Sequence, residues 1–149
     1  MTREYTNRKI VLNRRPQGDL RDGDLSMLSE PVRELSQGEF LLKTIWLSLD
    51  PYMRPRMSDI KNYLQPIGIG KVIVGETVSV VIETKSEKYN WGDCVTCFSG
   101  WQEYFLAHGA MKNICLIDDQ GLPQSVFLGS AGMPGRTANS GLTFLGKLN

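Results

Sequence analysis

Residues 71–84 read KVIVGETVSVVIET, and this stretch decides the fold class because two β-branched runs flank a single glycine, Gly75. Valine, isoleucine and threonine favour strands, since a side chain branched at Cβ fits an extended, pleated backbone. A glycine inside such a pattern is typical of a bulge or bend, which barrels use to turn corners. The stretch therefore predicts two strand segments joined by a bend at Gly75.

A second strand is predicted at residues 40–49, FLLKTIWLSL. Alternation would place Leu41, Ile45, Leu47 and Leu49 on one face and Phe40, Leu42 and Trp46 on the other. Apolar side chains on both faces indicate a central strand that is covered on each side.

Further short strands are predicted outward from these two, and turn residues separate them. They span residues 8–14, 94–98, 101–106 and 114–117. Many short strands between Gly, Pro, Asn and Asp turns are typical of an antiparallel barrel or sandwich. Residues 8–15 are locally basic but are interrupted by apolar residues, so we interpret them as an exposed edge strand rather than a binding patch.

The C-terminal part of the chain lacks the strand patterns that precede it. Residues 129–135, GSAGMPG, are glycine-rich, and residues 136–149 have little strand character and could begin a helix. The proline-containing residues 51–65 allow only a short helical turn. We predict a β-rich domain over residues 1–128, followed over residues 129–149 by a junction loop and the start of a helix.

The composition and charge of the chain limit the classes of function that it can have. A chain of 149 residues with 41% hydrophobic and 22% charged residues can form one globular domain. With 17 Lys and Arg against 16 Asp and Glu, no electrostatic footprint for nucleic acid or an anionic membrane is present. No apolar leader and no run of about 20 apolar residues occurs, so we expect a cytoplasmic protein with reduced cysteines.

Two common types of site are not favoured by the spacing. Cys94, Cys97, His108 and Cys115 are ligand types for zinc. However, Cys94 and Cys97 are three apart on a predicted strand and would point to opposite faces, and His108 is interpreted as a loop residue. We therefore predict no metal site and interpret the cysteines as buried thiols.

The glycines at 129, 132 and 135 lack the context of a phosphate-binding loop. No Lys-Ser/Thr pair follows them, and Pro134 removes one backbone donor. No nucleophile-elbow sequence GxSxG occurs either. The residues themselves indicate a soluble β-rich domain and no more.

One stretch resembles a known family. Residues 47–57, LSLDPYMRPRM, resemble a signature of the zinc-independent medium-chain dehydrogenase/reductases, which include prostaglandin, alkenal double-bond and curcumin reductases. Residues 91–93 (WGD), 99–104 (SGWQEY) and 128–138 (LGSAGMPGRTA) follow in the family's order. The likeness covers nearly the whole chain.

The resemblance implies a fold and an activity. The fold would be a mainly β, chaperonin-10-like distorted barrel with short helices, lacking the Rossmann domain that follows it in the family. The full-length protein would use NADPH to transfer hydride to the C=C bond of small hydrophobic α,β-unsaturated aldehydes or ketones, without a metal. The isolated domain would be inactive and monomeric, and the full-length protein a homodimer.

The resemblance also assigns roles by position. Pro51 and Tyr52 would face the nicotinamide, and Tyr52 and Tyr63 would contact the substrate. Met133 and Thr137 would contact the cofactor from this domain. No catalytic residue is assigned.

The sequence departs from the family at several positions. Gly75-Glu76-Thr77 stands where glycines are common, and Arg136 stands where an apolar residue is usual. Asn139 replaces a tyrosine, and Arg54-Pro55-Arg56 introduces a proline. Two alternatives stay open: a free-standing, non-enzymatic barrel that binds a small hydrophobic ligand or a protein partner, and a quinone oxidoreductase.

Overall fold

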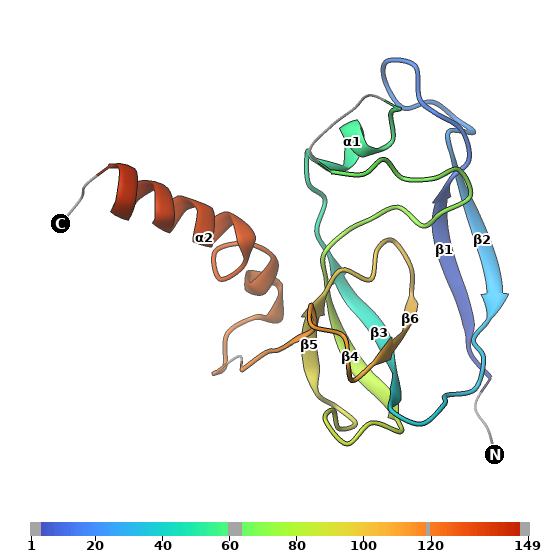
Figure 1. The fold of residues 1–149 in the computed structure, drawn as a ribbon, viewed down its shortest axis with the longest axis vertical. Coiled ribbons are helices and arrows are strands. Elements are labelled where there is room, and N and C mark those ends of the chain that lie inside the picture. Colours follow the sequence, from blue (N-terminus) through green and yellow to red (C-terminus); the bar gives the residue numbers. More distant parts are fainter. Residues whose placement is uncertain (1–3, 60–63, 119, 147–149) are drawn as a thin grey trace.

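A computed structural model describes residues 4–59, 64–118 and 120–146 of the chain. The elements in chain order are β1 (Thr6–Leu12), β2 (Leu25–Pro31), β3 (Glu39–Leu47), α1 (Met53–Arg56), β4 (Thr77–Thr84), β5 (Cys94–Cys97), β6 (Tyr104–His108), β7 (Cys115–Leu116), the 3₁₀ helix η1 (Gln124–Leu128), α2 (Met133–Ser140) and the π-helical turn η2 (Gly141–Leu145). Figure 1 shows α1 at one end of the strands and α2 projecting away from them. The prediction of a mainly β, chaperonin-10-like barrel without a Rossmann domain is confirmed.

Two antiparallel sheets form the barrel. β1 pairs with β2, and the larger sheet has the order β6-β3-β4-β5-β7. The sheets are joined by backbone hydrogen bonds from β1 to residues 70–73 and 101–103, among them Ile10 N–H to Trp101 O at 2.8 Å and Ile73 N–H to Ile10 O at 3.0 Å. The interpretation of residues 8–15 as an exposed edge strand is therefore wrong, because β1 is paired along both sides.

The basic residues of this strand do not form a free patch. Each lies within ion-pair distance of a carboxylate: Arg8 of Glu103, Lys9 of Glu30, Arg14 of Asp24 and Arg15 of Asp59. Hydrogen bonding to Arg14 lowers the pKa of Asp24, as does the Arg21 backbone N–H. The interpretation of residues 8–15 as something other than a binding patch agrees with this pairing.

β3 is the central strand that its sequence predicts, since it lies between β6 and β4. Phe40, Leu41 and Leu42 are buried, whereas Ile45 and Trp46 are 43% and 50% exposed. Cover on both faces is thus confirmed for the first half of the strand and wrong for the second half.

Gly75, where the sequence predicts a bend between two strands, lies between two segments with different partners, but only the second is a strand, β4. Before it, Val72 bridges to Val11 of β1, and after it β4 pairs with β3 and β5. Its φ is not among the positive values, so space explains the glycine. A Cβ there would lie 2.8 Å from Leu47 Cδ1 and 3.2 Å from Trp101 Cδ1.

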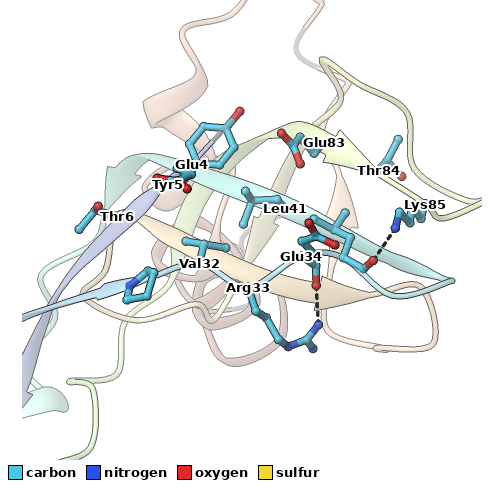
Figure 2. Close-up of a pocket in the computed structure, with 12 residues that line it drawn as sticks. Glu4, Tyr5, Thr6, Val32, Arg33, Glu34, Leu41, Glu83, Thr84 and Lys85 are labelled. Carbon is cyan, nitrogen blue, oxygen red and sulfur yellow. Dashed lines mark hydrogen bonds between the residues drawn. The ribbon is translucent and has the colours of Figure 1, made fainter. Parts of the chain in front are cut away.

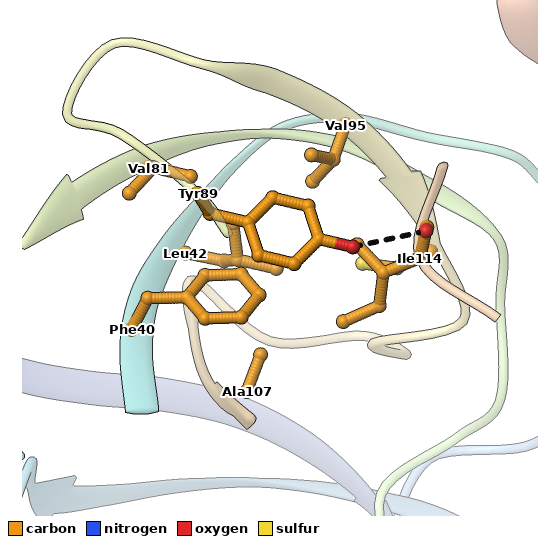
Figure 3. Packing of buried hydrophobic residues seen from close by; sticks show 8 residues of the cluster. Phe40, Leu42, Val81, Tyr89, Val95, Ala107 and Ile114 are labelled. Atoms are coloured by element: carbon orange, nitrogen blue, oxygen red, sulfur yellow. Dashed lines mark hydrogen bonds between the residues drawn. The ribbon is translucent and has the colours of Figure 1, made fainter. Parts of the chain in front are cut away.

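Buried side chains, most of them from the larger sheet, pack together into one hydrophobic core, which we call the sheet core (Figure 3). It comprises Phe40, Leu42, Val81, Tyr89, Val95, Cys97, Ala107 and Ile114. The rings of Phe40 and Tyr89 stack with centroids 4.3 Å apart, and the Tyr89 hydroxyl donates to Ile114 O at 3.2 Å. A second core, the segment core, comprises Leu12, Met53, Met57, Ile67 and Ile73.

Replacing Tyr89 with Phe tests the polar bond inside the sheet core. The ring stays, but the Ile114 carbonyl loses its buried donor, so we predict a loss of about 1 kcal/mol in the free energy of unfolding. Denaturant unfolding measures it, with Tyr5→Phe as the control because Tyr5 lies outside both cores. Equal stability of Tyr89→Phe and wild type would contradict this assignment.

Gly100 and Gly70 provide a matched pair at the junction between the sheets. Both have a positive φ, 80° and 75°, but a Cβ at Gly100 would lie 2.6 Å from Ile73 O, whereas Gly70 has open space. Alanine at either position costs about 1–2 kcal/mol for the left-handed backbone. We predict that Gly100→Ala loses about 1–3 kcal/mol more than Gly70→Ala in thermal or denaturant unfolding, and equal losses would exclude the close approach.

Candidate functional site

Residues 50–57 are held on the barrel by two methionines. Met53 and Met57 are one helical turn apart on α1 and therefore share a face. Both are buried in the segment core, at 4% and 2% exposure. Tyr52 packs half-buried against the same core, and Pro51 is exposed. The methionines thus anchor the Pro51-Tyr52 pair, with Pro51 exposed and the Tyr52 hydroxyl turned into the interior.

Three arginines hold the loops on either side of α1. Arg54 donates to Gly18 O and to Ser58 Oγ, and Arg56 Nε donates to Gln65 O at 2.9 Å. Arg15 Nη1 donates to Met57 O at 3.1 Å and to Ile67 O at 2.7 Å. Arg54 and Arg56, which flank the proline that departs from the family's sequence, therefore tie residues 50–57 to neighbouring loops by hydrogen bonds to backbone carbonyls.

Two carboxylates lie beside this segment. Glu76, the residue after Gly75, is only 8% exposed, and its backbone carbonyl accepts from Ser48 N–H at 2.9 Å. Burial raises the pKa of Glu76, Arg136 opposes that rise, and Asp50 adds to it. Asp50 Oδ2 is buried and has no hydrogen-bond partner among the described residues. Sequence reasoning did not assign either acid to the site; the available signal was a lone glutamate inside the β-branched run of residues 71–84.

α2 brings together the two residues predicted to contact the cofactor. Thr137 Oγ1 donates to Met133 O at 3.0 Å, one turn back along the helix. A shallow groove runs along this face, and we call it the α2 groove. It is lined by Met133, Arg136, Thr137, Ser140, Gly141, Phe144 and Leu145. Asp50 and Arg136 act on the pKa of Glu76 in opposite directions, Asp50 raising it and Arg136 lowering it.

The glycine-rich loop before α2 packs against its own backbone. A Cβ at Gly132 would lie 2.2 Å from Phe127 O, and one at Gly135 would lie 1.7 Å from Ser130 O. These glycines are required for a tight turn, as predicted, since the space beside them is filled by the loop itself.

The remaining sequence-derived candidates are dispersed. Cys97 is buried in the sheet core, whereas Cys94 accepts a hydrogen bond from Gln124 Nε2 at 3.0 Å, so the two thiols point apart as predicted. Cys115 is exposed, and the prediction that it is buried is wrong. His108 ends β6 instead of lying in a loop, and its Nδ1 accepts from Ala110 N–H at 3.1 Å. Tyr63 lies outside the described residues.

The described residues contain neither a cluster of metal ligands nor a membrane-spanning helix. Across residues 4–59, 64–118 and 120–146, no three or more His, Cys, Asp or Glu side chains lie close enough to hold a metal ion. Within the same ranges, no helix is long and apolar enough to cross a bilayer.

A cavity of about 540 Å³ lies elsewhere, between the start of β1 and the paired ends of β3 and β4 (Figure 2). Its two cations are already bound: Arg33 to Glu39 at 2.6 Å, which lowers the pKa of Glu39 to about 2, and Lys85 to Leu35 O at 2.7 Å. It contains none of the predicted site residues. We therefore place the candidate site at residues 50–57 and the α2 groove.

The chain is similar in sequence to a family of oxidoreductase domains and to NADP-dependent reductases. Residues 8–114 match the family described as the N-terminal domain of oxidoreductase. The NADPH-dependent curcumin reductase of Escherichia coli is 42% identical over 95% of this chain and 40% of its own length. The NADP(+)-dependent 2-alkenal reductase of Nicotiana tabacum is 31% identical over 95% of this chain and 42% of its own length.

A solved structure gives the same result. The structure of CurA from Vibrio vulnificus in complex with NADPH superposes with a TM-score of 0.86 and 38% identity, over 95% of this chain and 42% of that one. The chain thus spans about two fifths of the length of these relatives. By the match over residues 8–114, the chain belongs to the oxidoreductase N-terminal domain family of the medium-chain dehydrogenase/reductases.

Proposed function

We propose that this chain is the substrate-side domain of an NADPH-dependent reductase that acts on the C=C bond of α,β-unsaturated aldehydes and ketones. The observation that carries the proposal is the placement of the Pro51-Tyr52 pair, which Met53 and Met57 anchor on the segment core with Pro51 exposed and Tyr52 half-buried. The relatives named as NADPH-dependent curcumin reductase and 2-alkenal reductase support it. The activity belongs to the full-length protein, and we propose that the 149-residue chain is inactive alone.

The residues present fit a nicotinamide cofactor on one of its sides. The α2 groove is open and combines the thioether of Met133, which suits a flat ring, with the hydroxyl of Thr137. Pro51, which is exposed on the barrel, would add a rigid apolar surface. We assign these three residues, together with Tyr52, to cofactor contact; the chain's own glycine-rich loop is filled by its backbone and would bind no phosphate.

The proposed chemistry needs one donor from this domain. NADPH, when bound, supplies the hydride. As the β-carbon of the substrate is reduced, negative charge develops on the carbonyl oxygen, and a positioned hydroxyl stabilises it. We assign that donor role to Tyr52 and assign Tyr63 to the substrate pocket. The apolar side chains around Tyr52 would exclude water, which strengthens the interaction.

We also propose a domain division, an oligomeric state and a class of partner for the protein. Residues 1–128 would form the catalytic barrel, and residues 129–149 would lead through α2 towards a nucleotide-binding domain. The chain would be monomeric by itself and the full-length enzyme a cytoplasmic homodimer, with a small hydrophobic carbonyl compound as its substrate and no nucleic acid or membrane as a partner.

Replacing Tyr52 with Phe in the full-length protein tests the donor. The ring packing is kept and the hydroxyl is lost, so we predict a fall of about 10²-fold in kcat/KM for a 2-alkenal. The KM for NADPH should change less than about threefold. Tyr5→Phe serves as the control, and an unaltered kcat/KM in Tyr52→Phe would remove the hydroxyl from the mechanism.

Comparing the 149-residue chain with the full-length protein tests whether the chain is inactive alone. Absorbance at 340 nm, followed with NADPH and a 2-alkenal, should fall only with the full-length protein. Sustained NADPH oxidation by the 149-residue chain alone would refute the proposed inactivity. A quinone that is reduced by the full-length protein, when no alkenal is, would favour the quinone oxidoreductase alternative.

A further inference from the structure

A further cavity lies between α1 and the loop that joins β1 to β2, and we call it the arginine pocket. Its volume is about 460 Å³, and it is lined by residues 15–18 together with Arg54, Ser58 and Asp59. Figure 1 shows this loop beside α1, at one end of the strands. The arginine pocket shares no lining residue with the α2 groove or with the cavity of Figure 2, so it is a separate feature of the surface.

Two arginines line this pocket, and the protein holds both of them in place. Arg15 Nη1 donates to Met57 O at 3.1 Å, and the Arg15 side chain is only 25% exposed. Arg54 Nη1 donates to Ser58 Oγ at 2.9 Å, and Arg54 Nη2 donates to Gly18 O. Because these bonds already order the two long side chains, a ligand that binds to them loses less side-chain entropy.

The hydrogen bonds of the two arginines leave further donors for a ligand. A guanidinium group carries five N–H groups. Within residues 4–59, 64–118 and 120–146, neither Nε group donates a hydrogen bond, and Arg15 Nη2 has only an ion pair with Asp59. Ser58 Oγ accepts from Arg54, and its own proton can be donated to another acceptor. The lining therefore favours a ligand that accepts hydrogen bonds.

The acid in the lining of the pocket satisfies these donors poorly. The Asp59 side chain is 84% exposed, and it lies 3.4 Å from Arg15 Nη2, farther than the roughly 2.7–2.9 Å of a charge-assisted hydrogen bond. Arg15 and Arg54 face this single acid, so positive charge is in excess in the lining. The loose contact with Asp59 also indicates the kind of group that the arginines accept at this place, which is a carboxylate.

The size of the pocket fits a small organic molecule better than a bare ion. One water molecule takes up about 30 Å³ in the liquid, and the pocket is many times larger than that. Pro16 and the aliphatic stems of the two arginines add apolar surface to its lining. A short hydrocarbon chain attached to the anionic group can therefore lie in the same cavity.

We propose that the arginine pocket binds a small organic monocarboxylate, whose oxygens accept hydrogen bonds from Arg15, Arg54 and Ser58. The planar fork of a guanidinium group matches the two oxygens of a carboxylate, and one negative charge balances the excess positive charge of the lining. The bound anion would tie residues 15–18 to α1, the helix that follows the Pro51-Tyr52 pair. This site goes beyond the proposed function and does not depend on it.

A titration of the nitrogen-15-labelled 149-residue chain with butanoate, followed by NMR at neutral pH, tests the site directly. The amide signals of residues 15–18 and 54–59 should shift and saturate with a Kd of about 1 mM. Butanamide has nearly the same shape but no charge, and it should bind at least about tenfold more weakly. Equal binding of the two probes, or shifts confined to other residues, would overturn the proposal. Inorganic phosphate that binds as tightly as butanoate would overturn the assignment to a carboxylate.

Two variants change the charge of the pocket and keep both arginines. Asp59→Asn removes the competing carboxylate, so butanoate should bind about threefold more tightly. Ser58→Asp adds a tethered carboxylate beside Arg54, which should compete with butanoate and weaken its binding at least about fivefold. Glu87→Gln is the matched control for Asp59→Asn, because Glu87 is an exposed acid outside the pocket, and it should leave the affinity unchanged.

Arg54→Gln removes one of the two cations and should weaken butanoate binding about tenfold. Arg54 also holds the loop through Gly18 O, so thermal unfolding of this variant is measured alongside. If Arg54→Gln fails to fold, the Asp59 and Ser58 variants decide the matter. Equal affinity in Asp59→Asn and Glu87→Gln, or undiminished binding in Ser58→Asp, would overturn the proposal.

Discussion

Backbone hydrogen bonds between β1 and two irregular segments, residues 70–73 and 101–103, join the two sheets into one barrel. The same bonds bring Ile73 and Trp101 beside Leu12, where the segment core forms. Met53 and Met57 can insert only because that core exists, and their insertion anchors Pro51 and Tyr52. The candidate site therefore depends on contacts between the strand β1 and two backbone segments that have no regular strand structure.

The strands with period-two patterns could be predicted because their side chains record which face is buried. β3 and β4 are examples. β2 was not predicted, since most of its side chains are exposed and it is held by backbone pairing with β1. The interpretation of residues 8–15 as an exposed edge strand failed for a related reason: pairing with irregular segments about 60 and 90 residues away leaves no local pattern in the sequence.

The site was predictable only in part. Pro51, Tyr52, Met133 and Thr137 were assigned from a resemblance, and the structure places Met133 and Thr137 in one groove. The effect of Arg136 on the pKa of Glu76 could not be deduced, because the two residues are 60 apart in the sequence.

The central claim is that residues 50–57 and the α2 groove form one site for the cofactor and substrate. Hydrogen–deuterium exchange of the full-length protein with and without NADPH tests it most directly. The account predicts slower amide exchange in residues 50–57 and 133–140 when NADPH is bound, and unchanged exchange around the cavity of Figure 2. Protection confined to that cavity, or none in either of the two segments, would contradict the account.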